Sequence, residues 1–308
     1  MPVPVVLAES MAQAAPSASA RDNGMSVAAA RLAGWQVYEF PQDFVQCGDA
    51  DAALWHVPEQ PRPTAAIWVG FIPSPERYAA VYEAARARNL YLPNSLEQHL
   101  EAQEFDRTYL RLGALTPESR VIRSIDEAEA TAVALGLPVF VKGAVQSRKA
   151  KGVHACVAGT AEELVALTQA LLELDNQSRG RVIVRRLLRL RHGRVAAGDF
   201  PLGREFRVFV LHGEIAGCGY YWEGEDSLSV MTVEERRVVL ELALEAARRL
   251  ETPYVAVDIG QEEGGWWWVI ETGDAQFSGL SQIPPLALWK RLREIAEAAI
   301  QNSAGAPI

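Results

Sequence analysis

The stretch YVAVDIGQEEGGWWWVIETGD, residues 254–274, holds two apolar runs on either side of the pair Gly264-Gly265. Two glycines between β-branched and aromatic runs are typical of a two-residue hairpin turn. That turn places Asp258 opposite Glu271 on the neighbouring strand. Directly opposed side chains share one face of the sheet, with Cβ atoms about 4.5–5.5 Å apart. The stretch therefore predicts two carboxylates side by side, each at the end of an apolar strand.

Two facing carboxylates repel one another and need a cation between them. Magnesium bound by one or two carboxylates and by substrate phosphates meets this need. Asp274, three residues beyond Glu271, is a candidate third ligand. Two alternatives stay open: both acids turn into solvent, or one of them pairs with an arginine. The same turn also pairs Ile259 with Ile270, and a slip of register would break the whole pattern.

Lysine is rare in this chain and concentrated in one place. Three of its four lysines, against 26 arginines, lie in VFVKGAVQSRKAKGVHA, residues 139–155. The run VFVK brings Lys142 to the end of a buried strand, where an ammonium group is costly unless a phosphate or carboxylate meets it. The loop that follows can cover a polyphosphate with its amide, hydroxyl and ammonium groups. Its candidate residues are Ser147, Lys149, Lys151 and Gly152. A lysine that reaches solvent and an ordinary exposed turn are the plainer alternatives.

A third motif, EFRVFVLHGEI at residues 205–215, reads as another hairpin with His212-Gly213 at its turn. Alternation along the strand puts Glu205, Arg207 and Phe209 on one face. Arg207 either forms a structural salt bridge or binds a transferred phosphoryl group through its planar fork.

Upstream, strands at 35–40 and 65–72 precede a helix at 74–89, which predicts an α/β domain with a parallel sheet. A second helix is expected over about 94–112, with Asn94 as its N-cap. Farther along, VHACVA at 153–158 reads as a strand. Residues 1–26 lack the features of a signal peptide and are expected to be a disordered leader; whether the natural start is Met1 or Met25 stays open.

Composition narrows the class of protein. A net charge of −9 over 308 residues argues against general nucleic-acid binding, and the sequence has no apolar run of membrane-spanning length. The arginine-rich segment 181–194 could still form a basic strip, but a solvated strand face is the simpler interpretation. Cys47, Cys156 and Cys218 have neither disulfide-framework nor zinc spacing, which fits a reducing, cytoplasmic protein.

Taken in order, these motifs resemble the ATP-grasp superfamily over residues 93–282. The resemblance implies an α/β and α+β protein: an N-terminal Rossmann-like pre-ATP-grasp domain, followed by two subdomains that hold ATP between them. It also implies Mg²⁺ and activation of a carboxylate as an acyl phosphate, which an amine then attacks. The expected domains are 27–105, 106–185 and 186–308.

Position by position, the resemblance implies that Lys142 and the 147–152 loop contact the ATP phosphates. Arg107 stands where most members have their first nucleotide-binding lysine, and residues 185–187 match the segment that meets adenine. The residues implied in nucleotide binding are Arg107, Lys142, Ser147, Lys149, Lys151, Gly152, Arg185, Arg186, Leu187 and Glu205. Arg207 and Lys142 are implied in catalysis, and Asp258, Glu271 and Asp274 in metal binding.

The ending ETGD departs from the usual family pattern, because Gly273 stands where asparagine is common. Together with Arg107 in place of lysine, it suggests a divergent clade. The expected activity is a carboxylate-amine ligase that uses ATP and Mg²⁺, with small-molecule or peptide substrates and no membrane or nucleic-acid partner. A catalytically inactive nucleotide-binding regulator and an RNA-associated factor are the alternatives. The sequence leaves the substrates and a homodimer open.

Overall fold

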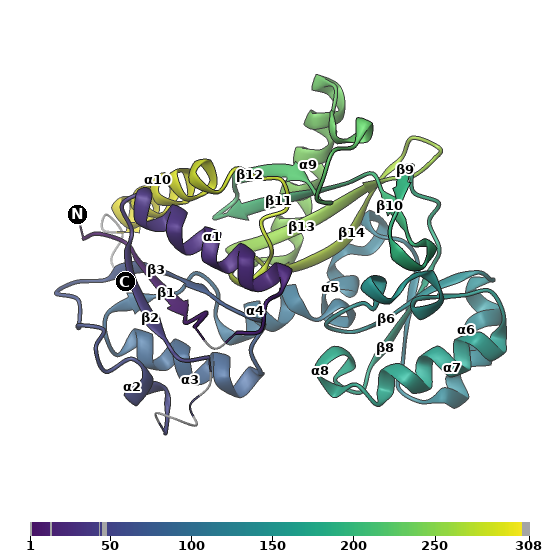
Figure 1. The fold of residues 1–308 in the computed structure, drawn as a ribbon, viewed down its shortest axis with the longest axis horizontal. Coiled ribbons are helices and arrows are strands. Elements are labelled where there is room, and N and C mark those ends of the chain that lie inside the picture. Colours follow the sequence, from purple (N-terminus) through teal and green to yellow (C-terminus); the bar gives the residue numbers. More distant parts are fainter. Residues whose placement is uncertain (1, 13, 43, 45–47, 304–308) are drawn as a thin grey trace.

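The computed structural model describes residues 2–303 except 13, 43 and 45–47, so Cys47 lies outside the described residues. Within them, the strands form three four-stranded sheets and one two-stranded sheet. In Figure 1 the N-terminal sheet lies at the left, the sheet of the later strands in the middle, and the third at the right. None of the helices in the described residues is both long and apolar enough to cross a membrane.

The N-terminal sheet is parallel, in the order β2-β1-β3-β4. Its strands are β1 (Val5–Glu9), β2 (Gln36–Phe40), β3 (Thr64–Val69) and β4 (Leu90–Tyr91), and its helices are α1 (Ala18–Leu32), α2 (Ala50–Ala53) and α3 (Pro75–Arg86). The prediction of a disordered leader over 1–26 is wrong. Residues 5–9 are all buried in the interior strand β1, because an apolar run too short for a signal peptide is long enough for a strand.

The helix expected over 94–112 is two helices, α4 (Leu96–Gln103) and α5 (Phe105–Leu112), which meet at the extended residue Glu104. Asn94 is not the N-cap; Ser95 is, in a capping box with Gln98. The Asn94 amide instead accepts from the backbone N–H of Tyr254 at 2.9 Å and donates to its carbonyl at 2.8 Å. Asn94 thus ties α4 to the middle sheet.

The sheet at the right of Figure 1 has the order β5-β8-β6-β7. It consists of β5 (Ser119–Ile122), β6 (Val139–Gly143), β7 (Val157–Ala158) and β8 (Val182–Arg186), with α6 (Ala128–Leu135), α7 (Ala161–Leu172) and α8 (Asp175–Ser178). The strand expected at 153–158 is mostly absent. Residues 153–155 form a 3-10 turn, and only 157–158 pair with β6.

The middle sheet is antiparallel, in the order β12-β11-β13-β14. Its strands are β11 (Glu205–Leu211), β12 (Glu214–Tyr220), β13 (Tyr254–Gln261) and β14 (Trp267–Asp274); α9 (Val233–Leu250) packs on it, and β9 (His192–Val195) and β10 (Pro201–Gly203) form the small sheet. The turn predicted at His212-Gly213 is confirmed, because Leu211 pairs with Glu214.

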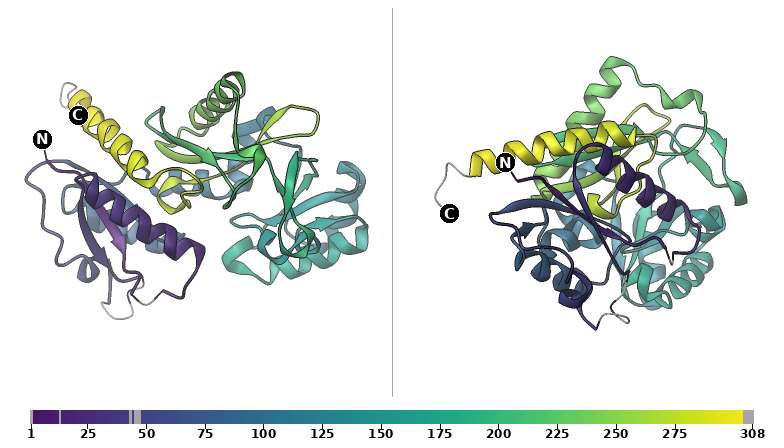
Figure 2. Two further views of the ribbon diagram at one scale, coloured as in Figure 1. Left: turned by 45° about the horizontal axis from the view of Figure 1, so that its top comes forward. Right: turned by 60° about the vertical axis from the view of Figure 1, so that its left-hand side comes forward.

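The last helix, α10 (Pro285–Ser303), returns to the start of the chain and lies beside α1, as both views in Figure 2 show. Trp289 of α10 meets Trp35, which follows α1, edge to face at 5.4 Å. One apolar core joins β1, α1 and α10 to Phe209 and Tyr254 of the middle sheet. This shared core fixes the N-terminal sheet against the middle one.

Candidate active site

The pairing of Asp258 with Glu271 across β13 and β14 is confirmed. The turn that leads to it differs from the prediction, because the N–H of Glu262 bonds to the carbonyl of Trp266 at 2.8 Å and leaves a three-residue loop. A bulge restores the register, since Ile259 pairs with Val269 and Ile270 is the extra residue. The predicted Ile259–Ile270 pair is therefore wrong, and two shifts of one residue cancel before Asp258 is reached.

Asp258 is not a bare carboxylate. Arg207, its partner in the β11–β13 register, donates from Nε and Nη2 to its two oxygens, both at 2.7 Å. Its Nη1 donates to the carbonyl of Gly279 at 2.9 Å. Burial alone would lower the pKa of Arg207, but Asp258 raises it on balance. Of the interpretations left open by the sequence, pairing of one acid with an arginine is the one observed.

Glu271 has a different cation, the ammonium group of Lys142 at the end of β6. Lys142 is 3% exposed, so a strand-end lysine that reaches solvent is excluded. Burial alone would raise the pKa of Glu271, yet Lys142 and Lys149 together hold it at about 2. Burial also lowers the pKa of Lys142, against the attraction of Glu271.

Glu205 and Lys149 form a third pair, with Nζ and Oε2 3.7 Å apart and both side chains largely buried. Burial raises the pKa of Glu205. For Lys149 burial acts in the opposite direction but is outweighed by Glu205, which raises its pKa. Lys149 also lies 5.7 Å from the ring centroids of Tyr221 and Trp222. The loop lysine is therefore fixed inside the site.

Two cavities meet at these charges. The smaller, of about 330 Å³, has a largely apolar wall that includes Phe140, Leu187 and Ile270. The larger, of about 1220 Å³, lies between the N-terminal domain and the middle sheet. Ser147 and Glu271 line both. Of the predicted site residues, the smaller cavity is lined by Lys142, Ser147, Lys149, Arg185, Arg186, Leu187, Glu205 and Glu271, and the larger by Ser147, Arg207, Asp258 and Glu271.

Arg107, predicted to contact the nucleotide, lines neither cavity. Its Nε donates to Glu104 at 2.9 Å, and Arg179 and Arg181 bind the same carboxylate. This cluster forms because Glu104 is buried at the break between α4 and α5 and needs cationic partners. Arg107 therefore has a structural partner and is not brought to the site.

Lys151 and Gly152 also lie outside the lining of both cavities. Gly152 has φ +93°, and a Cβ there would come within 2.8 Å of the carbonyl oxygen of Gly198. Its observed role is the close packing of the 147–152 loop against the neighbouring turn at 197–199.

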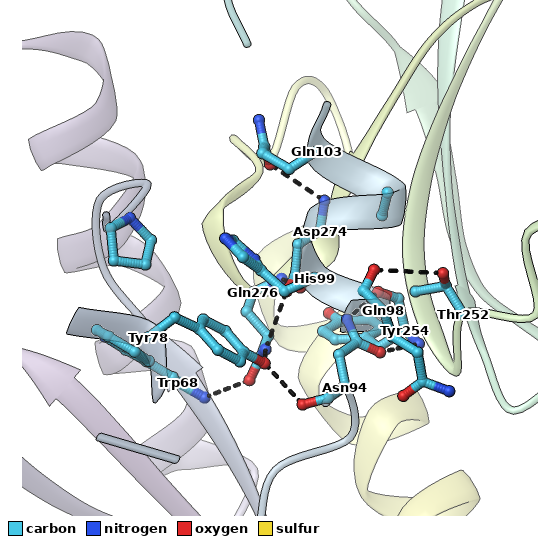
Figure 3. Close-up of polar contacts among 12 residues, drawn as sticks. Trp68, Tyr78, Asn94, Gln98, His99, Gln103, Thr252, Tyr254, Asp274 and Gln276 are labelled. Atoms are coloured by element: carbon cyan, nitrogen blue, oxygen red, sulfur yellow. Dashed lines mark hydrogen bonds and ion pairs between the residues drawn. The ribbon is translucent and has the colours of Figure 1, made fainter. Parts of the chain in front are cut away.

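Asp274 does not join Asp258 and Glu271, and its assignment to the metal site is wrong. It is three residues from Glu271, so the alternation of a strand turns it to the opposite face. Figure 3 shows it among Gln103, His99 and Gln276, in a buried network between α4 and the N-terminal domain. Its Oδ2 lies 2.9 Å from Nδ1 of His99, and both side chains are fully buried.

The six arginines of 181–194 do not form one strip. Arg181 binds Glu104 at 2.7 Å, Arg191 donates to Gln261 at 3.0 Å and Arg194 binds Asp226 at 3.0 Å. Arg185 is buried beside the smaller cavity. These different partners explain the arginine content without a nucleic-acid surface.

Sequence reasoning missed several residues that shape the site. Phe105 supports Lys142 and Arg185, whose charged atoms lie 5.3 and 4.1 Å from its ring centroid. Tyr221 lies under Arg207, with 4.8 Å between Cζ and the ring centroid. The one usable signal was the aromatic pair Tyr221-Trp222 directly after a strand whose neighbour carries Arg207.

Asp258 and Glu271 form a donor set that fits Mg²⁺, because two opposed carboxylates face one cavity and substrate phosphates can complete the shell. Within the described part of the chain, no three His, Cys, Asp or Glu side chains gather into a metal-binding group. The residues therefore fit a metal that is held jointly with a nucleotide.

The three sheets and the charges between the cavities define an ATP-grasp protein, which confirms the fold predicted from the sequence. Residues 134–292, just over half of the chain, match an ATP-grasp domain family, the third family of its clade, and the chain belongs to that family. No curated protein matches it by sequence.

Solved structures show the same fold over nearly the whole chain. D-alanine–D-alanine ligase from Bacillus anthracis, complexed with ATP, is 12% identical at a TM-score of 0.68 and covers 100% of each chain. A RimK domain ATP-grasp protein from Sphaerobacter thermophilus DSM 20745 is 15% identical, at 0.61, covering 95% of this chain and 99% of its own. The ATP-grasp ligase PsnB, complexed with a minimal precursor, is 13% identical, at 0.59, covering 96% and 99%.

Proposed function

We propose that the protein is an ATP-dependent carboxylate-amine ligase that works through an acyl phosphate. The observation that carries this proposal is the position of Glu271, which lies between an apolar cavity of nucleotide size and a larger, polar one. Lys142 and Lys149 on one side and Asp258 and Arg207 on the other surround the place where a γ-phosphate would meet a second substrate.

In this proposal the base of ATP occupies the smaller cavity, and Lys142 and Lys149 bind its phosphates. Asp258 and Glu271 would hold Mg²⁺, which supplies charge neutralisation of the phosphates when bound. A carboxylate oxygen of the first substrate attacks the γ-phosphorus, and ADP leaves. The amine nitrogen then attacks the acyl carbon, loses a proton and displaces phosphate. Arg207 faces the larger cavity and would stabilise the acyl phosphate with N–H groups not engaged by Asp258.

The printed names of structural neighbours support the substrate class, since one joins two D-alanines and another is a ligase in complex with a precursor. We extend this to small-molecule or peptide carboxylates and amines for the present chain. The large cavity, of about 1220 Å³, has room for more than a single amino acid.

Trapping with hydroxylamine tests the first half-reaction before the amine is known. The protein is incubated with ATP, Mg²⁺, hydroxylamine and pooled carboxylates, and hydroxamates are sought by mass spectrometry. An ATP-dependent hydroxamate supports the acyl phosphate. Binding of ATP without hydroxamate, ADP or phosphate formation over the full pool would instead identify a nucleotide-binding regulator.

A further inference from the structure

Arg185 is a buried arginine whose hydrogen bonding is incomplete. It is the fourth residue of β8, is 5% exposed and lines the smaller cavity. Its Nη1 donates to the carbonyl of Ile270 at 2.6 Å. Its Nε and Nη2 have no hydrogen-bond partner among the described residues. A buried guanidinium with two free donors is costly for the fold alone, so its environment indicates a missing acceptor.

The charge around Arg185 shows what kind of acceptor is missing. Arg185 and Lys142 lie against the same ring, that of Phe105, with charged atoms 4.1 and 5.3 Å from its centroid. Lys149 is the third cation of this wall, and the carboxylates that face these cations here are those of Glu205 and Glu271. Three cations against two carboxylates leave an excess of positive charge in a buried place, which favours an anion.

The sequence assigned a cation to this part of the site but chose the wrong residue. Arg107 binds Glu104 and lines neither cavity, whereas Arg185 lines the smaller cavity close to Lys142. The match of 185–187 to the adenine-binding segment suggested a backbone role for Arg185, and its side chain was not considered.

We propose that the Arg185 guanidinium binds a phosphate of the nucleotide through Nε and Nη2, as the third phosphate-binding cation beside Lys142 and Lys149. This inference rests on the proposed nucleotide binding and adds a residue to it. The planar fork suits a phosphate, which can accept two parallel N–H bonds.

Calorimetric titration of adenosine, AMP and ADP with Mg²⁺ into the parent and into Arg185→Met tests the inference. We expect the variant to lose at least about tenfold in ADP affinity, the effect of one charge-assisted contact, and to keep adenosine affinity within about twofold. Arg120→Met is the matched control, because Arg120 is an exposed arginine of β5 in the same sheet, paired with Val184. This control should bind all three ligands like the parent.

Equal losses for adenosine and ADP would overturn the proposal, because Arg185 would then act on the base. Unchanged ADP affinity with a lowered melting temperature would also overturn it and assign Arg185 a structural role. If Arg185→Met does not fold, Arg185→Lys decides: it keeps the charge but loses the fork, so ADP affinity equal to that of the parent contradicts the proposal. A parent that binds none of the three ligands removes the proposed nucleotide binding itself.

Discussion

Lys142 and Glu271 bind each other across two sheets, the lysine from β6 and the glutamate from β14. A phosphate-binding cation and a metal-binding acid therefore neutralise one another in this structure. Asp258 with Arg207 and Glu205 with Lys149 repeat the arrangement. Nucleotide and Mg²⁺ together can replace both partners of the Lys142–Glu271 pair, whereas either one alone leaves a buried charge unpaired.

Glu271→Gln should lower the free energy of unfolding by about 1–3 kcal/mol without ligands, because it leaves the buried Lys142 without its counterion. The sequence alone suggested that the change would relieve repulsion between Asp258 and Glu271. The structure reverses that expectation, since each acid has its own cation.

Urea denaturation of the parent, of Glu271→Gln and of Lys142→Met/Glu271→Gln measures the effect. The double variant removes both charges and should recover part of the loss. A single variant as stable as the parent would show that the ion pair contributes nothing.

The stability that Glu271 contributes should depend on pH. Its pKa is lowered from 4.5 to about 2 in the folded protein, so its contribution is complete above the unfolded pKa and is lost as the pH falls through the folded one. The difference in melting temperature between the parent and Glu271→Gln should therefore be constant near neutrality and shrink between about pH 4.5 and 2. A difference that stays constant across this range would contradict the ion pair.

Lys142→Met should weaken MgADP binding by about 1.5–3 kcal/mol, because it removes one charge-assisted contact to phosphate. Lys290→Met is the matched control: Lys290 is the remaining lysine, exposed on α10 and outside both cavities. Calorimetry on folded samples measures both. Equal affinities for Lys142→Met and the control would remove Lys142 from the phosphate site.

Asp274→Asn should cost about 1–3 kcal/mol of stability and leave MgADP affinity within about twofold. The carboxylate accepts from the Gln276 backbone at 3.1 Å and from its amide at 3.2 Å, beside His99 at 2.9 Å, and an amide cannot accept all three. Asp258→Asn is the contrast, because it should remove the stabilisation that Mg²⁺ adds in the presence of ADP. Loss of that stabilisation in Asp274→Asn would return Asp274 to the metal site.

The sequence predicted most of what depends on local pattern. The opposition of Asp258 and Glu271 followed from two apolar runs around a glycine turn, although the loop and the bulge that produce it were not visible. The buried lysine at 142 followed from VFVK. What failed depends on tertiary contacts: β1 is a strand only because β2 and β3 flank it, and Asn94 leaves its helix because Tyr254 is within reach. Asp274 failed for a local reason, since strand alternation already placed it on the other face.

The most direct test of the ligase follows one oxygen atom. Carboxylates labelled with ¹⁸O are supplied with ATP, Mg²⁺ and pooled amines, and the released phosphate is analysed by mass spectrometry. Because the carboxylate oxygen that attacks the γ-phosphorus stays on phosphorus when the amine displaces it, each phosphate should carry one ¹⁸O, in step with an amide product. Phosphate released without label would mean that water attacks ATP, and would contradict an acyl phosphate at this site.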